Sequence, residues 1–235
     1  MIRSLFLNAF IALYSLLFSS WGILISLFDR GGGRVHRYCA SPWASSILRV
    51  SGVRVKVGGL ENLEAGRPHI FMCNHQSFFD IFVLLSRLPG DFKFILKKEL
   101  MRIPVFGTAM KGARYIPIDR ADPRKAVQSM NQAADKIRQG VSVLIFPEGT
   151  RSEDGRLQGF KAGGFHLALK SGCDIVPVVI LNSNRVAPKG SLRIRRGSVS
   201  LHIGRPIAVG GYTKRTVHEL MGRVRDSMVQ MMGEA

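Results

Sequence analysis

The segment NHQSFFD at residues 74–80 holds a histidine and an aspartate at a spacing that suits acid–base chemistry. It follows PHIFMC, an apolar run typical of a buried strand, and it leads into FFDIFVLLSRL, which has helical spacing. A first helical turn can bring the Asp80 carboxylate back to His75, where it would fix the imidazole tautomer and leave the other ring nitrogen free as a base. Such a base could take a proton from an alcohol. The alternative is a surface histidine beside an acid that the helix dipole favours.

A second candidate site is FPEGTRS at residues 146–152, where a buried apolar run ends in a crowded turn. Gly149 would let the backbone approach a ligand closely, and the guanidinium of Arg151 suits a phosphate or carboxylate. An ordinary turn with a surface ion pair is the alternative. The chain has no Gly-rich phosphate loop, G-x-S-x-G elbow or G-x-G-x-x-G fingerprint, so serine-nucleophile and nucleotide chemistry lack their usual sequence supports.

The third candidate is the basic stretch KKELMRIPVFGTAMKGARYIPIDR at residues 97–120. Its basic residues are Lys97, Lys98, Arg102, Lys111, Arg114 and Arg120. As solvated charges they would carry no function, but beside an anionic headgroup they could bind phosphate. Arg120, which follows Asp119 at the end of a predicted strand, is the best placed of them.

Taken together, these segments resemble the glycerolipid acyltransferases, and specifically the bacterial 1-acylglycerol-3-phosphate acyltransferases. NHQSFFD matches the N-H-x4-D signature of that family, and FPEGTRS resembles its third block. Lys97, Pro104, Gly107 and Asp119–Arg120 match the second block in order, and IVPVVI at residues 175–180 is similar to the fourth. The four blocks follow the family order across residues 74–180.

The resemblance implies a reaction and its catalytic residues. His75 would be the general base that deprotonates the free sn-2 hydroxyl of a lysophosphatidic acid, and Asp80 would orient it. The oxygen would then attack an acyl thioester carried by coenzyme A or acyl carrier protein (ACP), without a covalent acyl-enzyme. No metal and no cofactor beyond this acyl-CoA or acyl-ACP co-substrate is implied.

The resemblance also implies which residues bind the acceptor. Glu148 and Arg151 would bind its glycerol and phosphate. The full set implied to bind substrate or shape its site is Lys97, Arg120, Glu148, Gly149, Thr150 and Arg151. The fourth block, including Val176 and Pro177, would line the acyl-donor side, with a plain core strand as the alternative. Lysophosphatidylglycerol, a lyso-ornithine lipid or glycerol-3-phosphate remain alternative acceptors, because the same base would serve them.

The composition favours a membrane partner. The chain has 235 residues and a formal charge of +18, yet 46% of its residues are hydrophobic, which excludes a disordered basic tail. Such charge indicates an anionic partner. Few aromatic residues are interleaved with the basic ones, so we expect no nucleic acid as a partner. Three scattered cysteines indicate neither a disulfide framework nor a zinc site and fit a reducing compartment.

Residues 5–28 carry no charge, and a helix of that length could cross the ~30 Å bilayer core. A signal peptide and a buried helix are the alternatives. Three arginines follow at residues 30, 34 and 37 against one before, which predicts a cytoplasmic (inner) membrane protein whose following domain faces the cytoplasm. Glycines 31–33 and a second apolar helix around Trp43 would also allow a helical hairpin dipping into one leaflet of the phospholipid bilayer. The sequence leaves span and hairpin open.

Beyond residue 50, strand-like and helix-like segments alternate, which predicts an α/β fold. We expect a mixed sheet flanked by helices, similar to the glycerol-phosphate acyltransferases, with the membrane-embedded hairpin at the N-terminus. Residues 1–50 would be the membrane-anchoring helices and residues 51–235 the acyltransferase domain. A helix should start near Ser77, a plausible N-cap. Helical spacing also predicts which residues of two later helices face the core. The predicted inner-face residues are Val127, Met130, Ala134 and Ile137 in one helix and Val217, Leu220, Val224 and Met228 in the last.

Overall fold

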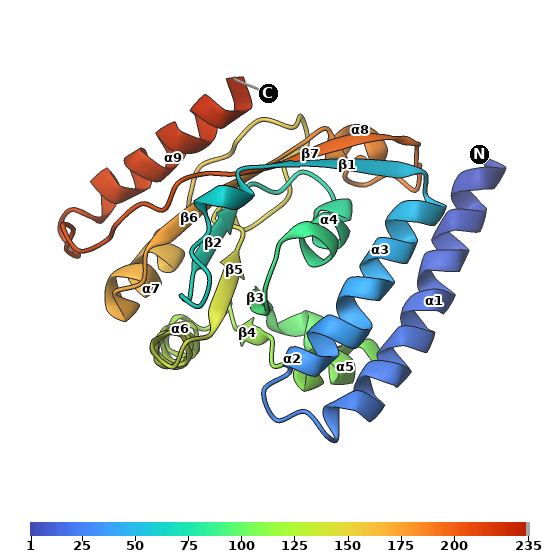
Figure 1. Ribbon diagram of the computed structural model, residues 1–235, viewed down its shortest axis with the longest axis horizontal. Helices are drawn as coiled ribbons and strands as arrows, with labels where there is room; N and C mark the ends of the chain where they lie inside the picture. Colours follow the sequence, from blue (N-terminus) through green and yellow to red (C-terminus); the bar gives the residue numbers. More distant parts are fainter. Residues whose placement is uncertain (234–235) are drawn as a thin grey trace.

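The computed structural model describes residues 1–233, and its centre is a seven-stranded sheet (Figure 1). The strands are β1 (Val53–Gly58), β2 (Ile70–Cys73), β3 (Phe92–Lys97), β4 (Ile116–Ile118), β5 (Ser142–Ile145), β6 (Ile175–Leu181) and β7 (Gly197–Ile203). They lie in the order β1-β7-β6-β2-β5-β3-β4. Every neighbouring pair is parallel except β6 and β7, which are antiparallel. The predicted mixed sheet is therefore confirmed.

Helices cover both faces of the sheet, and each face has its own buried apolar cluster. Figure 1 shows α6, α7 and α9 on one side and α4, α3, α1 and α5 on the other. Their bounds are α1 (Ile2–Ser26), α3 (Ser41–Val50), α4 (Phe79–Arg87), α5 (Phe106–Gly112), α6 (Pro123–Arg138), α7 (Gly163–Ser171) and α9 (Val217–Gly233). Short helical segments lie between the longer elements: α2 (Gly33–Val35), η1 (His36–Ala40), η2 (Leu60–Asn62), η3 (Lys98–Arg102) and α8 (Ser183–Val186).

The inner face predicted for α9 is confirmed, whereas that predicted for α6 is partly wrong. All four predicted residues of α9 are buried, and each such side chain contributes roughly 1.5–3 kcal/mol. Helix α6 starts as predicted, because the Asp122 carboxylate accepts hydrogen bonds from the Arg124 and Lys125 N–H groups. Val127, however, is 60% exposed. The fully buried residues of α6, Ala133, Ala134 and Ile137, all lie in its second half, and Met130 is partly buried against the same cluster.

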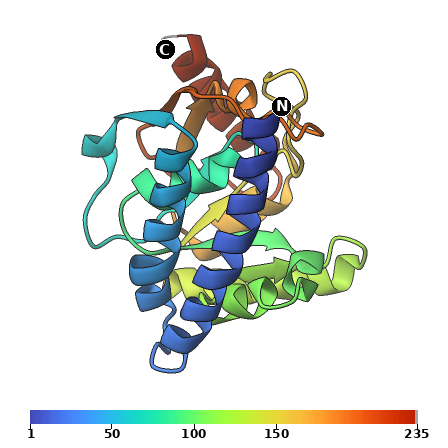
Figure 2. The same ribbon diagram turned by 90° about the vertical axis from the view of Figure 1, so that its right-hand side faces the viewer.

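The N-terminal helices form a hairpin that packs on the sheet domain. Helices α1 and α3 lie side by side in both views (Figures 1 and 2). Trp43 and Ile47 of α3 belong to the same apolar cluster as α4. Helix α1 contacts the domain at both ends: Arg3 donates to the Ile194 and Ser51 carbonyls, and a Cβ on Gly112 would come 2.6 Å from Ser26. The division of the chain at residue 50 stays a prediction.

The carboxyl ends of the central strands gather the segments that the sequence marked as functional. NHQSFFD follows β2, FPEGTRS follows β5, and Lys97 ends β3. Strand β2 lies between β5 and β6, so the first two segments emerge side by side. Loops at this edge of an α/β sheet are the usual place for a binding site.

Candidate active site

The predicted contact between His75 and Asp80 is present. Nδ1 of His75 lies 2.8 Å from Oδ2 of Asp80. The imidazole stacks on Phe146 with the ring centroids 3.9 Å apart. In the neutral imidazole, the tautomer that pairs with a carboxylate has its N–H at Nδ1, which donates the hydrogen bond, and its lone pair at Nε2. Nε2 makes no hydrogen bond within residues 1–233, and His75 lines a cavity.

The Asp80 carboxylate is fixed by the turn that precedes its helix. Its Oδ2 atom also accepts hydrogen bonds from the N–H groups of Gln76 (2.7 Å) and Ser77 (2.9 Å), and the side chain is fully buried. Helix α4 begins at Phe79 with Phe78 as its N-cap, one residue after Ser77, where the sequence predicted the cap. The Ser77 hydroxyl still bonds the first helical residue. That hydroxyl accepts from the Phe79 N–H and donates to the Ala187 carbonyl. The acid therefore cannot turn away from His75 without breaking backbone hydrogen bonds.

Glu148 lies behind the histidine, away from the cavity. Its Oε1 accepts a hydrogen bond from the His75 N–H at 2.6 Å, and its Oε2 accepts one from the Gln158 N–H at 2.8 Å. Burial raises the pKa of the Glu148 carboxyl, and these backbone hydrogen bonds oppose the rise. The carboxylate thus connects the loop after β2 to the loop after β5. Its predicted contact with the acceptor's glycerol stays a prediction.

The cavity beside His75 has a volume of about 450 Å³. Six of the eight predicted site residues line it: His75, Lys97, Arg120, Gly149, Thr150 and Arg151. From this polar end it extends between the hairpin and α5, where Phe18, Cys39 and Ala109 line it. The site therefore combines a histidine, a group of cations and an apolar chamber.

The cations at the cavity are held in different ways. The Arg120 guanidinium donates to the Gly149 carbonyl, and Gly149 takes a positive φ of 74° that favours glycine. Lys97 lies 3.6 Å from Glu99, and both side chains are about half exposed. The Arg151 guanidinium makes no hydrogen bond or ion pair with the described part of the chain and lines the cavity. Arg151 is consequently the cation most available to a ligand.

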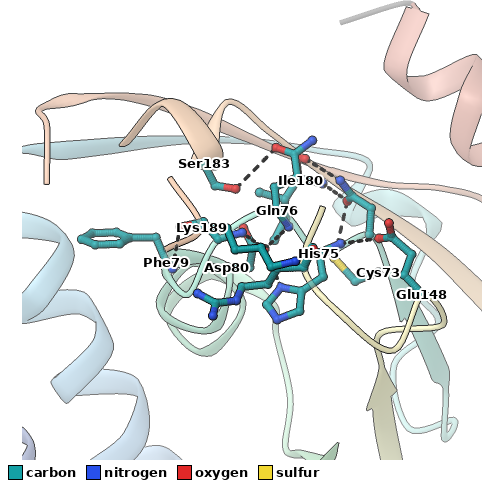
Figure 3. A network of polar contacts seen from close by, with 12 residues as sticks. Cys73, His75, Gln76, Phe79, Asp80, Glu148, Ile180, Ser183 and Lys189 are labelled. Atoms are coloured by element: carbon teal, nitrogen blue, oxygen red, sulfur yellow. Dashed lines mark hydrogen bonds and ion pairs between the residues drawn. The ribbon is translucent and has the colours of Figure 1, made fainter. Parts of the chain in front are cut away.

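Other polar residues hold the two loops, and sequence reasoning gave them no role. The Asn74 side chain pairs with the N–H and carbonyl of Ile180 on β6. Gln76 donates to the Gly155 carbonyl, and the Lys189 ammonium donates to the Arg151 carbonyl. Figure 3 shows this network around His75, with Asp80 and Glu148 on either side. Asn74 belongs to a motif and could have been singled out; Lys189 lies far along the chain and carries no local signal.

The fourth block is part of the core. Val176 and Pro177 are buried within β6, and neither lines the cavity that contains His75. Val176 is fully buried in the apolar cluster beneath α4. The position of these two residues agrees with the alternative interpretation, a plain core strand.

Known proteins are similar to this chain in sequence and in fold. The Acyltransferase family model matches residues 54–181, more than half of the chain. The 1-acyl-sn-glycerol-3-phosphate acyltransferase BAT2, chloroplastic, of Brassica napus is 38% identical over 206 residues, covering 87% of this chain and 59% of that protein. The human 1-acyl-sn-glycerol-3-phosphate acyltransferase alpha is 34% identical over 184 residues, covering 78% and 65%.

A solved structure extends the likeness to the whole fold. The 1-acyl-sn-glycerophosphate acyltransferase PlsC of Thermotoga maritima superposes with a TM-score of 0.83 at 25% identity, over 99% of this chain and 95% of that one. The superposition includes the N-terminal helices as well as the sheet domain. The chain spans less than two thirds of the length of the plant and human relatives. On these matches and the family model, the chain belongs to the acyltransferase family.

Proposed function

We propose that this protein transfers a fatty acyl group from acyl-CoA or acyl-ACP to the sn-2 hydroxyl of 1-acylglycerol-3-phosphate, giving phosphatidic acid for phospholipid biosynthesis. One observation carries the proposal: His75, whose Nδ1 is bonded to Asp80, lines a cavity with cations at one end and apolar walls at the other. A lysophospholipid has the matching parts, namely a phosphate, an alcohol and an apolar chain. The names of the relatives agree with it.

In the proposed reaction, Nε2 of His75 takes the proton of the sn-2 hydroxyl as its oxygen attacks the thioester carbonyl. The Asp80 carboxylate stabilises the resulting imidazolium through Nδ1. Collapse of the tetrahedral intermediate forms the ester and breaks the carbon–sulfur bond, and the thiolate regains a proton from the imidazolium. General base catalysis of this kind contributes about 10²–10⁴ in rate. No metal or resident cofactor takes part in this scheme.

The cations and the apolar chamber bind different parts of the substrates. Arg151, whose guanidinium has no partner in the described chain, binds the acceptor phosphate with Lys97 and Arg120 beside it. The apolar chamber between the hairpin and α5 takes a fatty acyl chain. Thr150 and Gly149 shape the turn between these regions. A phosphate-bearing acceptor fits this arrangement better than a lyso-ornithine lipid.

The hairpin associates with one leaflet of the bilayer. Helix α1 is long and apolar enough to cross a membrane, but it packs against the domain at both ends. A crossing helix would pull the charged domain into the hydrocarbon core. Leu13, Leu17 and Leu24 are exposed on its outer face, which supports a helix lying at the surface of the leaflet. In this proposal the membrane is the cytoplasmic (inner) one, and the catalytic domain faces the cytoplasm.

The proposal is tested with the purified protein in vesicles and a panel of lysolipids, each offered with acyl-CoA or acyl-ACP and analysed by mass spectrometry. We expect phosphatidic acid from 1-acylglycerol-3-phosphate at the highest kcat/KM. Faster acylation of lysophosphatidylglycerol or a lyso-ornithine lipid would keep the chemistry and overturn the acceptor. No transfer from any donor would overturn the proposed function.

A further inference from the structure

A second cavity, of about 410 Å³, lies beside the reaction cavity, between η3, α5, β4 and α6. Five of the side chains that line it are basic: Lys98, Arg102, Lys111, Arg114 and Lys136. Four of them belong to the basic stretch at residues 97–120, whose other two basic residues, Lys97 and Arg120, line the reaction cavity instead. The proposed acyl transfer therefore leaves this cluster, called here the five-cation pocket, without a role.

Little negative charge balances the five-cation pocket. Lys98 lies 3.1 Å from the Asp119 carboxylate, and this is the one ion pair made by these five residues within the described chain. The Arg114 guanidinium donates to the carbonyl of Arg30, which is neutral. Burial lowers the pKa of the Lys136 ammonium, and the positive charges of Arg114 and Lys93 lower it further. Like charges gathered in this way repel one another, and a bound anion would relieve the repulsion.

The five-cation pocket shares a wall with the reaction cavity. Tyr115 lines both cavities. In and around η3 and α5, four pairs of consecutive residues have one member lining the reaction cavity and the next lining the five-cation pocket. The pairs are Lys97 and Lys98, Leu100 and Met101, Met110 and Lys111, and Ala113 and Arg114. A wall made of one helix is about 10 Å thick. A flexible arm longer than that can reach from one cavity to the other around the η3 turn.

We propose that the five-cation pocket binds the phosphates of an acyl-CoA donor, its diphosphate and 3′-phosphate, while the pantetheine arm carries the thioester to His75. The inference rests on the proposed function, because it takes the acyl thioester from that reaction. Five cations in a concave site suit several phosphate groups on one small molecule, since a single phosphate monoester carries at most about two negative charges. A carrier protein would spread its acidic side chains over a broad surface, whereas these five cations line one concave site of about 410 Å³.

The test reverses the charges of two lining residues that make no polar contact in the structure described. Arg102 and Lys111 are exposed, and their side chains make no hydrogen bond or ion pair with residues 1–233. The variant R102E/K111E is therefore expected to fold. A matched control, K214E/R223E, changes the net charge by the same amount. Both residues are exposed, before and within α9, which packs on β6 and not beside β4 (Figure 1).

The full-length variants are compared with palmitoyl-CoA, palmitoyl-ACP and palmitoyl-pantetheine, which has no phosphate, as donors in mixed micelles. We expect R102E/K111E to raise the KM for palmitoyl-CoA by about tenfold or more, because two charged contacts are lost. The KM values for palmitoyl-pantetheine and 1-acylglycerol-3-phosphate should change less than about twofold, as should every value of the control. An equal rise for both CoA and pantetheine thioesters would overturn the proposal. So would a rise confined to palmitoyl-ACP, which would identify a carrier-protein surface, or to the lysolipid, which would identify a lipid headgroup site.

A binding measurement separates this proposal from the proposed function. Adenosine 3′,5′-bisphosphate is titrated into each protein by calorimetry, which needs no turnover. Saturable binding to the wild type and the control, weakened about tenfold or more in R102E/K111E, would support the pocket even if no lysolipid were acylated. Equal binding to all three proteins, or none to the wild type, would overturn it even if acyl transfer were observed.

Discussion

The Glu148 carboxylate accepts a hydrogen bond from the backbone N–H of His75 at 2.6 Å, with its second oxygen on the Gln158 N–H. An acid that the family resemblance implied for substrate binding therefore holds the backbone of the proposed base, His75. Since Glu148 does not line the cavity, its effect on turnover would be exerted through the position of His75.

The variant Glu148→Gln tests that arrangement. Glutamine has one acceptor oxygen, so one of the two buried N–H groups would lose its partner, at a cost of about 1–3 kcal/mol. We expect kcat to fall about tenfold or more while the KM for 1-acylglycerol-3-phosphate is almost unchanged. Glu219→Gln, at an exposed position on α9, is the control. A rise in the lysolipid KM at constant kcat would instead indicate direct contact with the glycerol.

Removing the Arg151 guanidinium should weaken binding of the acceptor. In Arg151→Ala we expect the KM for 1-acylglycerol-3-phosphate to rise about tenfold, because a charge-assisted phosphate contact is lost, while the donor KM stays constant. Arg156→Ala is the control, since Arg156 is in the same loop and its side chain is 88% exposed. Steady-state kinetics with each substrate varied in turn gives both values. A change confined to the donor would assign Arg151 to the other substrate.

Charges placed on the outer face of α1 should release the protein from membranes. Leu13 and Leu17 are exposed there, and burial of each in a leaflet would contribute roughly 1.5–3 kcal/mol. We expect L13D/L17D to lower partitioning into anionic vesicles by at least about tenfold in a sedimentation assay. The control V127D/V229D introduces the same charges on exposed valines of α6 and α9. Equal release of both variants, or of neither, would contradict a role for this face.

The turn of the hairpin depends on Asp29, whose carboxylate accepts hydrogen bonds from the Gly32 and Val35 N–H groups. Burial opposes its ionisation, but the backbone hydrogen bonds outweigh burial, so its folded pKa lies below the ordinary 3.8. The stabilisation is therefore complete above that value and is lost as the pH falls through the lower, folded pKa. We expect Asp29→Ala to reduce the free energy of unfolding by about 0.5–2 kcal/mol at pH 7.

This difference should shrink below pH 4, because the wild type then loses the same interaction. Urea unfolding in detergent across a pH series measures it, and Asp226→Ala on α9 is the control. A difference that grew as the pH fell would contradict the assigned sign.

The sequence predicts what depends on local spacing and misses what depends on packing between distant segments. The contact of His75 with Asp80 was predictable, because one strand, one turn and the start of one helix hold both residues. The orientation of Glu148 was not, because it follows from β2 lying beside β5. Val127 shows the same limit, since its spacing is helical but its side chain is left exposed while its neighbours Ala126 and Met130 pack against the buried cluster. Lys189 reaches the Arg151 carbonyl from 38 residues away, which no motif indicates.

The role of His75 as the base is tested most directly by the turnover of His75→Ala. Alanine keeps the backbone N–H that binds Glu148, so the loop should hold its shape while only the imidazole is lost. With the wild type and the variant in the same vesicles, and folding checked by circular dichroism, phosphatidic acid formation is followed by mass spectrometry. We predict a fall in kcat of about 10²–10⁴. A folded variant that turns over within a few fold of the wild type would contradict the assignment of His75 as the base.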